Sequence, residues 1–280
     1  YLYEYANDQY GDGTRFGRIP APNKEMVALE DYRTRHAQYK ADPDSQEVHR
    51  QHPFFVTWDD HEFTNNTWRG GAQNHDASEG DWLPRRNAAQ QAYFEWMPIR
   101  EDAQTLQSRI YRTFRLGNLA TLYMLDTRLV GRDREAPRED TTTIELPNRQ
   151  LLGAEQEAWL AEQLVTSVRN QARWNLFGQQ VMFAPQTETG VRAGNPDSWD
   201  GYRGARTRVF DMVERLLGQP QAEPALRLQL GGHVSDGLAQ LGARDDFIDH
   251  AETLGPFRRH ALAEQDEFLG DARGQFEAVG

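Results

Sequence analysis

The sequence has 280 residues, a hydrophobic fraction of 38% and a mean hydropathy of −0.82, which is enough for one large domain with a buried core. Its net charge of −12 argues against a nucleic-acid backbone as a stable partner, because no broad basic field would release counterions. The sequence contains no cysteine, which excludes disulfides and thiolate chemistry in these residues, and no run approaches the ~18 apolar residues of a membrane span.

The chain opens in an apolar and aromatic segment, residues 1–5, that predicts the end of a strand and carries Tyr3 and Glu4. Because this segment begins in mid-strand and without Met, we expect an incomplete N-terminus. Tyr3 is open to two interpretations, a core residue or a tyrosinate metal ligand, and a tyrosinate would favour Fe³⁺. A Gly-rich loop follows, and residues 22–50 are polar and compatible with a helix.

The densest chemical signal is the segment 54–66. A short apolar run predicts a buried strand, and it ends in Asp59, Asp60, His61 and Glu62, with Asn65 and Asn66 shortly after. The carboxyl end of a strand is where open α/β sheets place ligand chemistry. The alternative is a solvated acidic turn that caps the next helix. The apolar run before the acids, and the imidazole and amides after them, favour a metal site.

The remaining pattern alternates strands and helices, which indicates an α/β layered fold in a single domain over residues 1–280. We expect helices at 84–97, 153–168 and 203–217, a hairpin at 109–126, a surface excursion at 130–148, and strands at 174–183 and 226–233.

Several predicted strand and loop ends carry further candidate ligands. His233 ends the last predicted strand, and the loop before 203 carries Asp197 and Asp200. A site rich in oxygen donors with few imidazoles suits hard cations such as Ca²⁺, Mg²⁺ or Mn²⁺. Two such cations can clamp a phosphoryl oxygen and activate a water, while His61 could protonate a leaving alkoxide. Asp200 with Gly201 is equally compatible with a simple turn.

Arginines near these acids are candidate ligands for a substrate phosphate. Arg85 and Arg86 open the predicted helix at 84–97, where they either bind phosphate or form a solvated face. Arg128 follows the second hairpin strand in the sequence Asp126-Thr127-Arg128, which is also compatible with a helix cap containing an internal salt bridge.

The ordered set of motifs resembles the PhoD-like alkaline phosphatases, which are relatives of the metallophosphoesterases. The matching segments run in family order from residue 1 to about residue 217, and as a set they are specific. They include YLYEY at 1–5, WDDHE at 58–62, NN at 65–66, QAYFEWMPIR at 91–100, LDTR at 125–128, GQQV at 178–181 and WDGY at 199–202.

The resemblance implies a metallophosphoesterase-like α/β/β/α sandwich and an exported enzyme, periplasmic or secreted, that cleaves phosphomonoesters and phosphodiesters at alkaline pH with Ca²⁺ and Fe³⁺. It implies that Tyr3 ligates iron, that Asp60 with Asn65 or Asn66 lies at the second metal position, and that His61 is the catalytic histidine. Asp200 is implied as the late carboxylate ligand, and His233 is the nearest candidate for the late histidine. Small phosphate esters are the implied substrates.

The sequence departs from the family pattern at two places. The family's iron-ligating Cys and the Gly-Asp before its tyrosine motif lie upstream of residue 1. The family's late Gly-Asp-x-His is here Gly231-Gly232-His233, so the imidazole is displaced by one residue, which on a strand reverses its face. These departures support an alternative, a divergent or truncated relative that binds metal or phosphate without catalysis.

Overall fold

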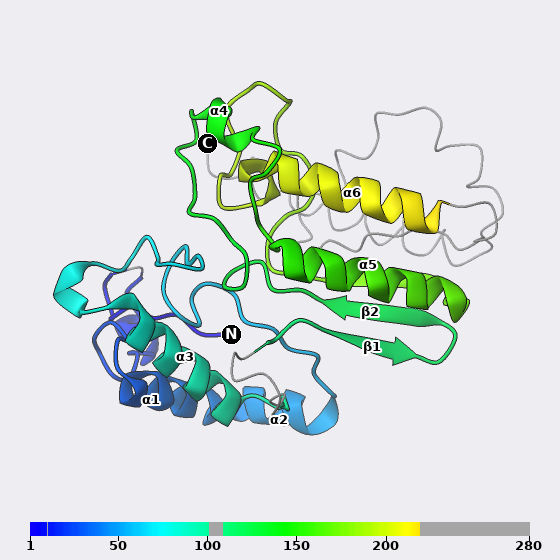
Figure 1. The fold of residues 1–280 in the computed structure, drawn as a ribbon. Helices are drawn as coiled ribbons and strands as arrows, with labels where there is room; N and C mark the ends of the chain where they lie inside the picture. Colours follow the sequence, from blue (N-terminus) through cyan, green and yellow to red (C-terminus); the bar gives the residue numbers. More distant parts are fainter. Residues whose placement is uncertain (10, 101–108, 219–280) are drawn as a thin grey trace, which may run out of the picture. The chain divides into compact units, whose positions relative to one another are not determined.

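The computed structural model describes residues 1–9, 11–100 and 109–218, which form a mixed α/β structure (Figure 1). All of them lie in one compact unit of the chain, Tyr1–Gly232. The expectation of a single domain over residues 1–280 therefore stays a prediction. The predicted strand at 226–233, with His233 at its end, lies outside the described residues.

A three-stranded sheet in the order β1–β2–β3 lies at the centre of the fold. The antiparallel pair β1 (Arg112–Leu116) and β2 (Ala120–Met124) confirms the predicted hairpin, and Gly117 turns between them with a φ of 60° that glycine adopts without steric cost. β3 (Trp174–Gly178) runs parallel to β2. The carboxyl ends of β2 and β3 therefore lie at one edge of the sheet, from which residues 125–128 and 179–181 emerge.

Two long helices confirm the predictions for residues 153–168 and 203–217. α5 (Ala154–Arg169) forms the crossover that a parallel β2–β3 pair requires, and it packs against α6 (Arg203–Leu217) (Figure 1). Their apolar stripes and the sheet enclose a buried core that includes Tyr123, Leu125, Leu160, Leu164, Phe177, Trp199, Tyr202, Val209 and Val213. Burial of these side chains stabilises the packing of α5 and α6 on the sheet, because removing apolar surface from water is the main force that favours folding.

The predicted helix at 22–50 is two helices, α1 (Leu29–Lys40) and α2 (Pro43–Gln51). The chain breaks between them because the Asp42 carboxylate accepts hydrogen bonds from the backbone N–H groups of Asp44 and Ser45, both at 3.0 Å, and caps α2. α1 packs against α3 (Trp82–Trp96), which confirms the helix predicted at 84–97. A second core fills the space around them, with Leu2, Met26, Tyr32, Trp58, Phe63, Ala89, Ala92 and Tyr93 among its members.

Four short helical segments lie in the loops: α4 (Thr141–Ile144) and the 3₁₀ turns Thr14–Phe16, Ala77–Glu79 and Trp199–Gly201. The expectation of a surface excursion at 130–148 is wrong in part. Ile144 is fully buried, and Arg132 is 1% exposed because it turns inward to an acidic loop described below.

Residues 1–5 and 54–58 are not strands of the sheet, so these two predictions are wrong. Two backbone carbonyls of 54–58 accept hydrogen bonds from side chains rather than from a neighbouring strand. Arg112 donates to the Val56 carbonyl at 2.6 Å, and the Gln180 amide donates to the Trp58 carbonyl at 2.8 Å. The segment is nevertheless held at the carboxyl edge of β2 and β3, so it still delivers its acids to that edge.

His36 on α1 predicts a pH-dependent stability. Its ring is fully buried beside Tyr93 and Trp96, and neither ring nitrogen has a hydrogen-bond partner among the described residues. Burial, with the nearby charge of Lys40, lowers the pKa of His36 from 6.5 to about 4. As the pH falls, His36 is therefore protonated in the unfolded chain before it is protonated in the folded protein. The free energy of unfolding is expected to decrease by about 3 kcal/mol between about pH 6.5 and about pH 4.

The measurement is the free energy of unfolding between pH 7 and pH 4 for the wild type and His36→Leu. The variant is expected to lose about 3 kcal/mol less over this interval. The control uses the exposed His52: the same effect of His36→Leu is expected in a His52→Gln background, because that substitution leaves the surroundings of His36 intact. An identical slope in the wild type and His36→Leu would contradict this account.

Candidate functional site

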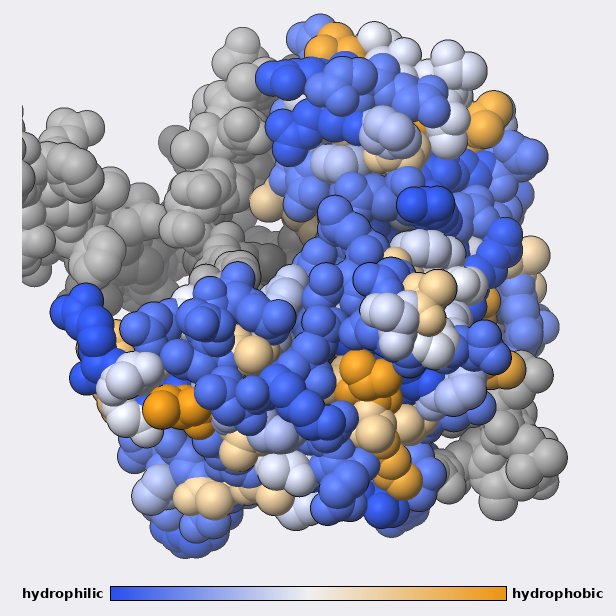
Figure 2. Space-filling model, turned by 90° about the vertical axis from the view of Figure 1, so that its left-hand side faces the viewer, coloured by the Kyte–Doolittle hydropathy of each residue, from blue (hydrophilic) through white to orange (hydrophobic). Residues whose placement is uncertain are grey.

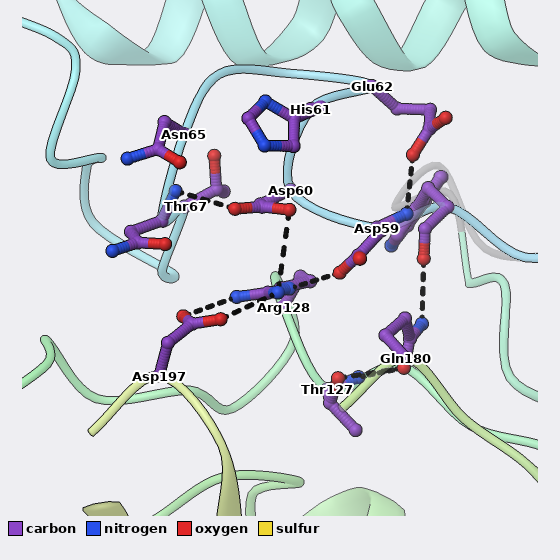
Figure 3. A network of polar contacts seen from close by, with 12 residues as sticks. Asp59, Asp60, His61, Glu62, Asn65, Thr67, Thr127, Arg128, Gln180 and Asp197 are labelled. Atoms are coloured by element: carbon purple, nitrogen blue, oxygen red, sulfur yellow. Dashed lines mark hydrogen bonds and ion pairs between the residues drawn. The ribbon is translucent and has the colours of Figure 1, made fainter. Parts of the chain in front are cut away.

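The acidic turn, residues 59–62, is held between two buried aromatic side chains. Trp58 and Phe63 meet edge to face with ring centroids 5.2 Å apart. The backbone N–H groups of Phe63 and Thr64 both donate to the Asp60 carbonyl at 2.8 Å, which closes the turn. This small, internally bonded loop places Asp60 and His61 close together at the site (Figure 3).

Arg128 gathers three carboxylates around one guanidinium (Figure 3). Its Nε donates to Asp59 Oδ1 at 2.6 Å, and its Nη2 lies 3.4 Å from Asp60 Oδ1. Its two terminal nitrogens form a bidentate pair with Asp197, at 2.7 and 3.0 Å. Arg128 is 2% exposed, so its guanidinium forms these ion pairs out of contact with the solvent. Asp59 lies 69 residues before Arg128 in the sequence and Asp197 lies 69 residues after it, so Arg128 joins two distant segments of the chain.

The charges in this network stabilise one another. Burial opposes the charge on Arg128, but Asp60, Asp197 and Asp59 outweigh it and raise the pKa of the guanidinium further. Burial also opposes ionisation of Asp197, yet Arg128 and Arg132 hold its pKa at about 2. Arg128 and Asp197 are therefore both charged at neutral and alkaline pH.

The loop that carries Arg128 is fixed by buried polar contacts. The Asp126 carboxylate accepts from the backbone N–H of Arg128 at 2.8 Å and of Leu129 at 3.0 Å. The Gln180 amide bonds both this loop, at the Leu125 carbonyl, and the start of the acidic turn. The helix-cap interpretation of residues 126–128 is therefore wrong: Asp126 caps a turn of its own loop, and Arg128 pairs with other acids.

His61 is oriented by Glu4. Its Nδ1 lies 2.7 Å from Glu4 Oε2, and the Glu4 side chain is fully buried. The rings of Tyr3 and Tyr5 lie on the imidazole, with centroid distances of 4.2 and 5.6 Å. Burial opposes protonation of His61, but the hydrogen bond to Glu4 and the charge of Asp60 outweigh it, so its pKa is raised. The structure thus brings Tyr3 and Glu4 to His61, the residue that follows Asp60.

Asn65 and Asn66 lie beside Asp60 with their amide nitrogens engaged. The backbone N–H of Asn66 donates to Asp60 Oδ2 at 2.8 Å. Both side-chain amides donate to Gln73 Oε1, at 2.9 and 2.8 Å, and Asn66 also donates to Glu135 at 2.9 Å. Among the described residues no group donates to either amide oxygen. These two oxygens are therefore available as hard donors.

Asp200 is not brought to this network. Its carboxylate is fully buried and accepts from Thr187 Oγ1 and the Gly194 N–H, both at 2.7 Å, and from Arg206 at 3.2 Å. Asp197, three residues earlier, is the loop acid that reaches Arg128. The sequence placed both acids in one loop and offered no signal that distinguished them, because the distinction depends on how the loop turns into the short 3₁₀ helix.

Arg85 is buried in contacts with other parts of the protein, and the phosphate contacts predicted for Arg85 and Arg128 stay predictions. The Arg85 guanidinium is 1% exposed and donates to Glu25 at 2.8 Å, Glu79 at 3.0 Å and the Tyr32 hydroxyl at 3.1 Å. These contacts tie α3 to α1 and to the loop before it. The sequence could not show this, because Glu25 and Glu79 are 60 and 6 residues away along the chain.

An open cleft of about 860 Å³ is lined by Tyr1, Tyr3, Tyr5, Tyr39 and Arg35, among other residues. Two of these tyrosines, Tyr3 and Tyr5, also contact the His61 ring. The cleft volume lies within the range that small-molecule sites occupy. His61 and Asp60 themselves do not line the cleft, so Tyr3 and Tyr5 are the link between it and the acidic turn.

The donor set suits a hard cation, and the described residues supply part of such a site. Asp60, Asn65 and Asn66 bring carboxylate and amide oxygens together, which are the donors that Ca²⁺ and Mg²⁺ prefer. In the described ranges, no group of three or more His, Cys, Asp and Glu side chains converges as a metal site.

None of the helices in residues 1–9, 11–100 and 109–218 combines the length and apolar character that a bilayer crossing needs. The face seen in Figure 2 is mostly hydrophilic, with hydrophobic residues in small separate patches.

Comparisons with known proteins agree with the motifs and the fold. A family model described as PhoD-like phosphatase matches residues 1–219. Alkaline phosphatase D of Bacillus subtilis (strain 168) is 39% identical over 225 residues, which cover 76% of this chain and 37% of that protein. A solved structure of PhoD matches with a TM-score of 0.66 at 36% identity, over 77% of this chain and 42% of that one.

This structural match confirms the predicted fold class, a mixed α/β fold of the metallophosphoesterase type. Of the α/β/β/α sandwich, the described residues contain one sheet, with α5 and α6 packed together in the core beside it. The chain spans about two-fifths of the length of these two relatives.

Proposed function

We propose, since this chain belongs to the PhoD-like phosphatase family, that it is the site-bearing part of an enzyme that hydrolyses phosphomonoesters and phosphodiesters. The observation that carries the proposal is the acidic turn itself. It holds Asp60 beside His61, with Arg128 and Glu4 contacting the two side chains. Such a set of fixed charges and one imidazole suits proton transfer and stabilisation of a charged transition state.

PhoD-like phosphatases are metal-dependent. We assign the metal donors to Asp60, Asn65 and Asn66, with Asp59 and Tyr3 beside them. Ca²⁺ and Fe³⁺ are the expected ions, and Mn²⁺ or Mg²⁺ are expected to substitute, because the donors are mainly oxygen atoms. Bound cations would supply positive charge that stabilises the phosphoryl group in its transition state.

The chain's own residues have distinct roles in this proposal. Glu4 occupies Nδ1 of His61, so Nε2 is the nitrogen left to deliver a proton to the leaving alkoxide. Arg128 keeps Asp59 and Asp60 close together despite their like charges. The cleft lined by tyrosines would hold the organic part of the ester. Small phosphate esters are therefore the proposed substrates.

Two earlier expectations remain predictions beside this proposal. A periplasmic or secreted location is expected from the family resemblance, and a stable nucleic-acid partner is not expected at a net charge of −12. His233 and Asp200 stay candidate metal ligands from the C-terminal part of the chain, by resemblance to the family. The Asp200 carboxylate, however, is bonded to Thr187 and Gly194 rather than to the network around Arg128.

A non-catalytic relative that binds metal or phosphate is the second candidate. It is favoured by one departure from the family pattern, the sequence Gly231-Gly232-His233 in place of Gly-Asp-x-His. It predicts stabilisation by cations without turnover.

The replacement of His61 by Ala separates these candidates. Catalysis at the acidic turn predicts that His61→Ala lowers kcat for p-nitrophenyl phosphate and for its bis-ester on the order of 10²- to 10⁴-fold. His52→Ala, which alters an exposed imidazole, is the matched control and is expected to keep the wild-type rate. Equal rates in His61→Ala and wild type, or no turnover in either, would contradict the enzymatic proposal.

A further inference from the structure

Glu4 is the buried acid that links the N-terminal segment to the acidic turn. Its side chain is fully buried, and each of its two oxygens has one close partner. Oε2 pairs with His61 Nδ1 at 2.7 Å, and Oε1 accepts from the Asn65 N–H at 2.7 Å. Thr64 Oγ1 also lies 3.2 Å from Oε1, but its single proton has a nearer acceptor in the Asn74 carbonyl at 2.9 Å. One carboxylate therefore contacts both the imidazole and the start of the asparagine pair.

These contacts show how Glu4 acts on the site. A carboxylate only accepts hydrogen bonds, so Nδ1 of His61 carries the shared proton and the ring has a defined orientation. Because both oxygens are already taken by protein donors, Glu4 is not arranged as a metal ligand. A buried carboxylate with a close donor on each oxygen is also rigid, since loss of either donor would leave a buried charge undersatisfied.

The backbone around Glu4 is held without the help of its carboxylate. The Leu2 N–H donates to Glu62 Oε1 at 3.2 Å, and the Met26 N–H donates to the Glu4 carbonyl at 3.0 Å. Arg35 also donates to the Tyr3 carbonyl. The segment would therefore keep its path in a variant that alters only the Glu4 carboxylate, so the effect on His61 can be tested separately.

We propose that Glu4 is a positioning residue for the phosphoester reaction: it holds His61 in one tautomer and orientation, with Nε2 directed to the leaving group. This inference rests on the proposed function, because it assigns to Glu4 an effect through His61. It concerns a different residue and a different measurement from those that test the function itself.

A double-mutant cycle in the full protein tests the proposal, with Glu4→Gln, His61→Ala and the double variant assayed for kcat and KM. Glu4→Gln is expected to lower kcat on the order of 10- to 100-fold, the range of partners that orient a functional histidine, with KM little changed. The loss is expected to be larger for an alkyl phosphate than for p-nitrophenyl phosphate, because the poorer leaving group depends more on a proton. In the His61→Ala background, Glu4→Gln is expected to cost no more than about 2-fold.

Glu62→Gln is the matched control, because Glu62 is a buried acid of the same turn that bonds the Asp59 and Leu2 N–H groups and not the imidazole. Its effect on kcat is expected to be the same in both backgrounds. Equal losses for Glu4→Gln with and without His61 would overturn the proposal, as would an unchanged leaving-group dependence. If Glu4→Gln does not fold, Glu4→Asp, which keeps the charge but shortens the reach, enters the same cycle with the same expectation. Absence of turnover in the wild type would instead refute the proposed function.

Discussion

Asp60→Asn is expected to lower kcat/KM for phosphate ester hydrolysis on the order of 10³-fold while the fold is retained. Asp60 is 4% exposed and lies between the Asn66 N–H and the Arg128 guanidinium, at 2.8 and 3.4 Å. An asparagine has nearly the same shape, so packing is kept. The substitution removes the negative charge that a hard cation requires at the centre of the donor set.

The measurement is steady-state hydrolysis at alkaline pH, with thermal unfolding as the check on folding. Glu162→Gln removes an exposed carboxylate from α5 and is the matched control, expected to retain the wild-type rate. A rate within a few-fold of wild type for a folded Asp60→Asn protein would show that the acidic turn is not the reaction centre.

Arg128→Ala is expected to lower the free energy of unfolding by about 3 kcal/mol and to abolish turnover. The substitution leaves Asp59, Asp60 and Asp197 close together with one fewer neighbouring cation. Asp59 is 43% exposed, so water relieves part of the repulsion, and the expected loss lies at the lower end of the range for broken buried pairs.

Chemical denaturation of wild type and Arg128→Ala at neutral pH measures this loss. Arg115→Ala is the matched control, since Arg115 is an exposed arginine on β1 that donates only to the turn beside it, at the Gly117 carbonyl, and little change is expected. Unfolding measured at acidic pH gives a second check. The pKa of Asp197 is lowered from 3.8 to about 2, so the stabilisation by its ionised carboxylate is present above pH 3.8 and is lost towards pH 2. This acid-dependent loss is expected to shrink in Arg128→Ala, and a loss of less than 1 kcal/mol at neutral pH would contradict the role assigned to Arg128.

Local sequence pattern predicted most of the regular structure. The helices expected at 84–97, 153–168 and 203–217 and the hairpin at 109–126 are present, because each has a clear apolar periodicity or turn signal. Residues 54–58 show the limit of this reasoning. Their apolar composition is that of a strand, yet arginine and glutamine side chains bond two of their backbone carbonyls in place of a neighbouring strand.

The candidate site was predicted as a group of residue types but not as a network. The acids, His61 and the asparagines lie within residues 59–66, so a short sequence motif identifies them. The partners that orient them are distant in sequence: Glu4 is 57 residues from His61, and Asp197 is 69 residues from Arg128. Arg85 and Arg128 looked equivalent as basic residues near acids, and only their three-dimensional contacts separate the structural arginine from the one in the site.

The most direct test of the central claim measures metal content and phosphoester hydrolysis on the same samples of wild type and Asp60→Asn. The account predicts that the wild type contains bound metal and hydrolyses both p-nitrophenyl phosphate and its bis-ester. It also predicts that chelation removes this activity and that Asp60→Asn has less metal and almost no turnover. Hydrolysis that persists after complete metal removal, or that is unchanged in Asp60→Asn, would contradict a metal-dependent reaction at the acidic turn.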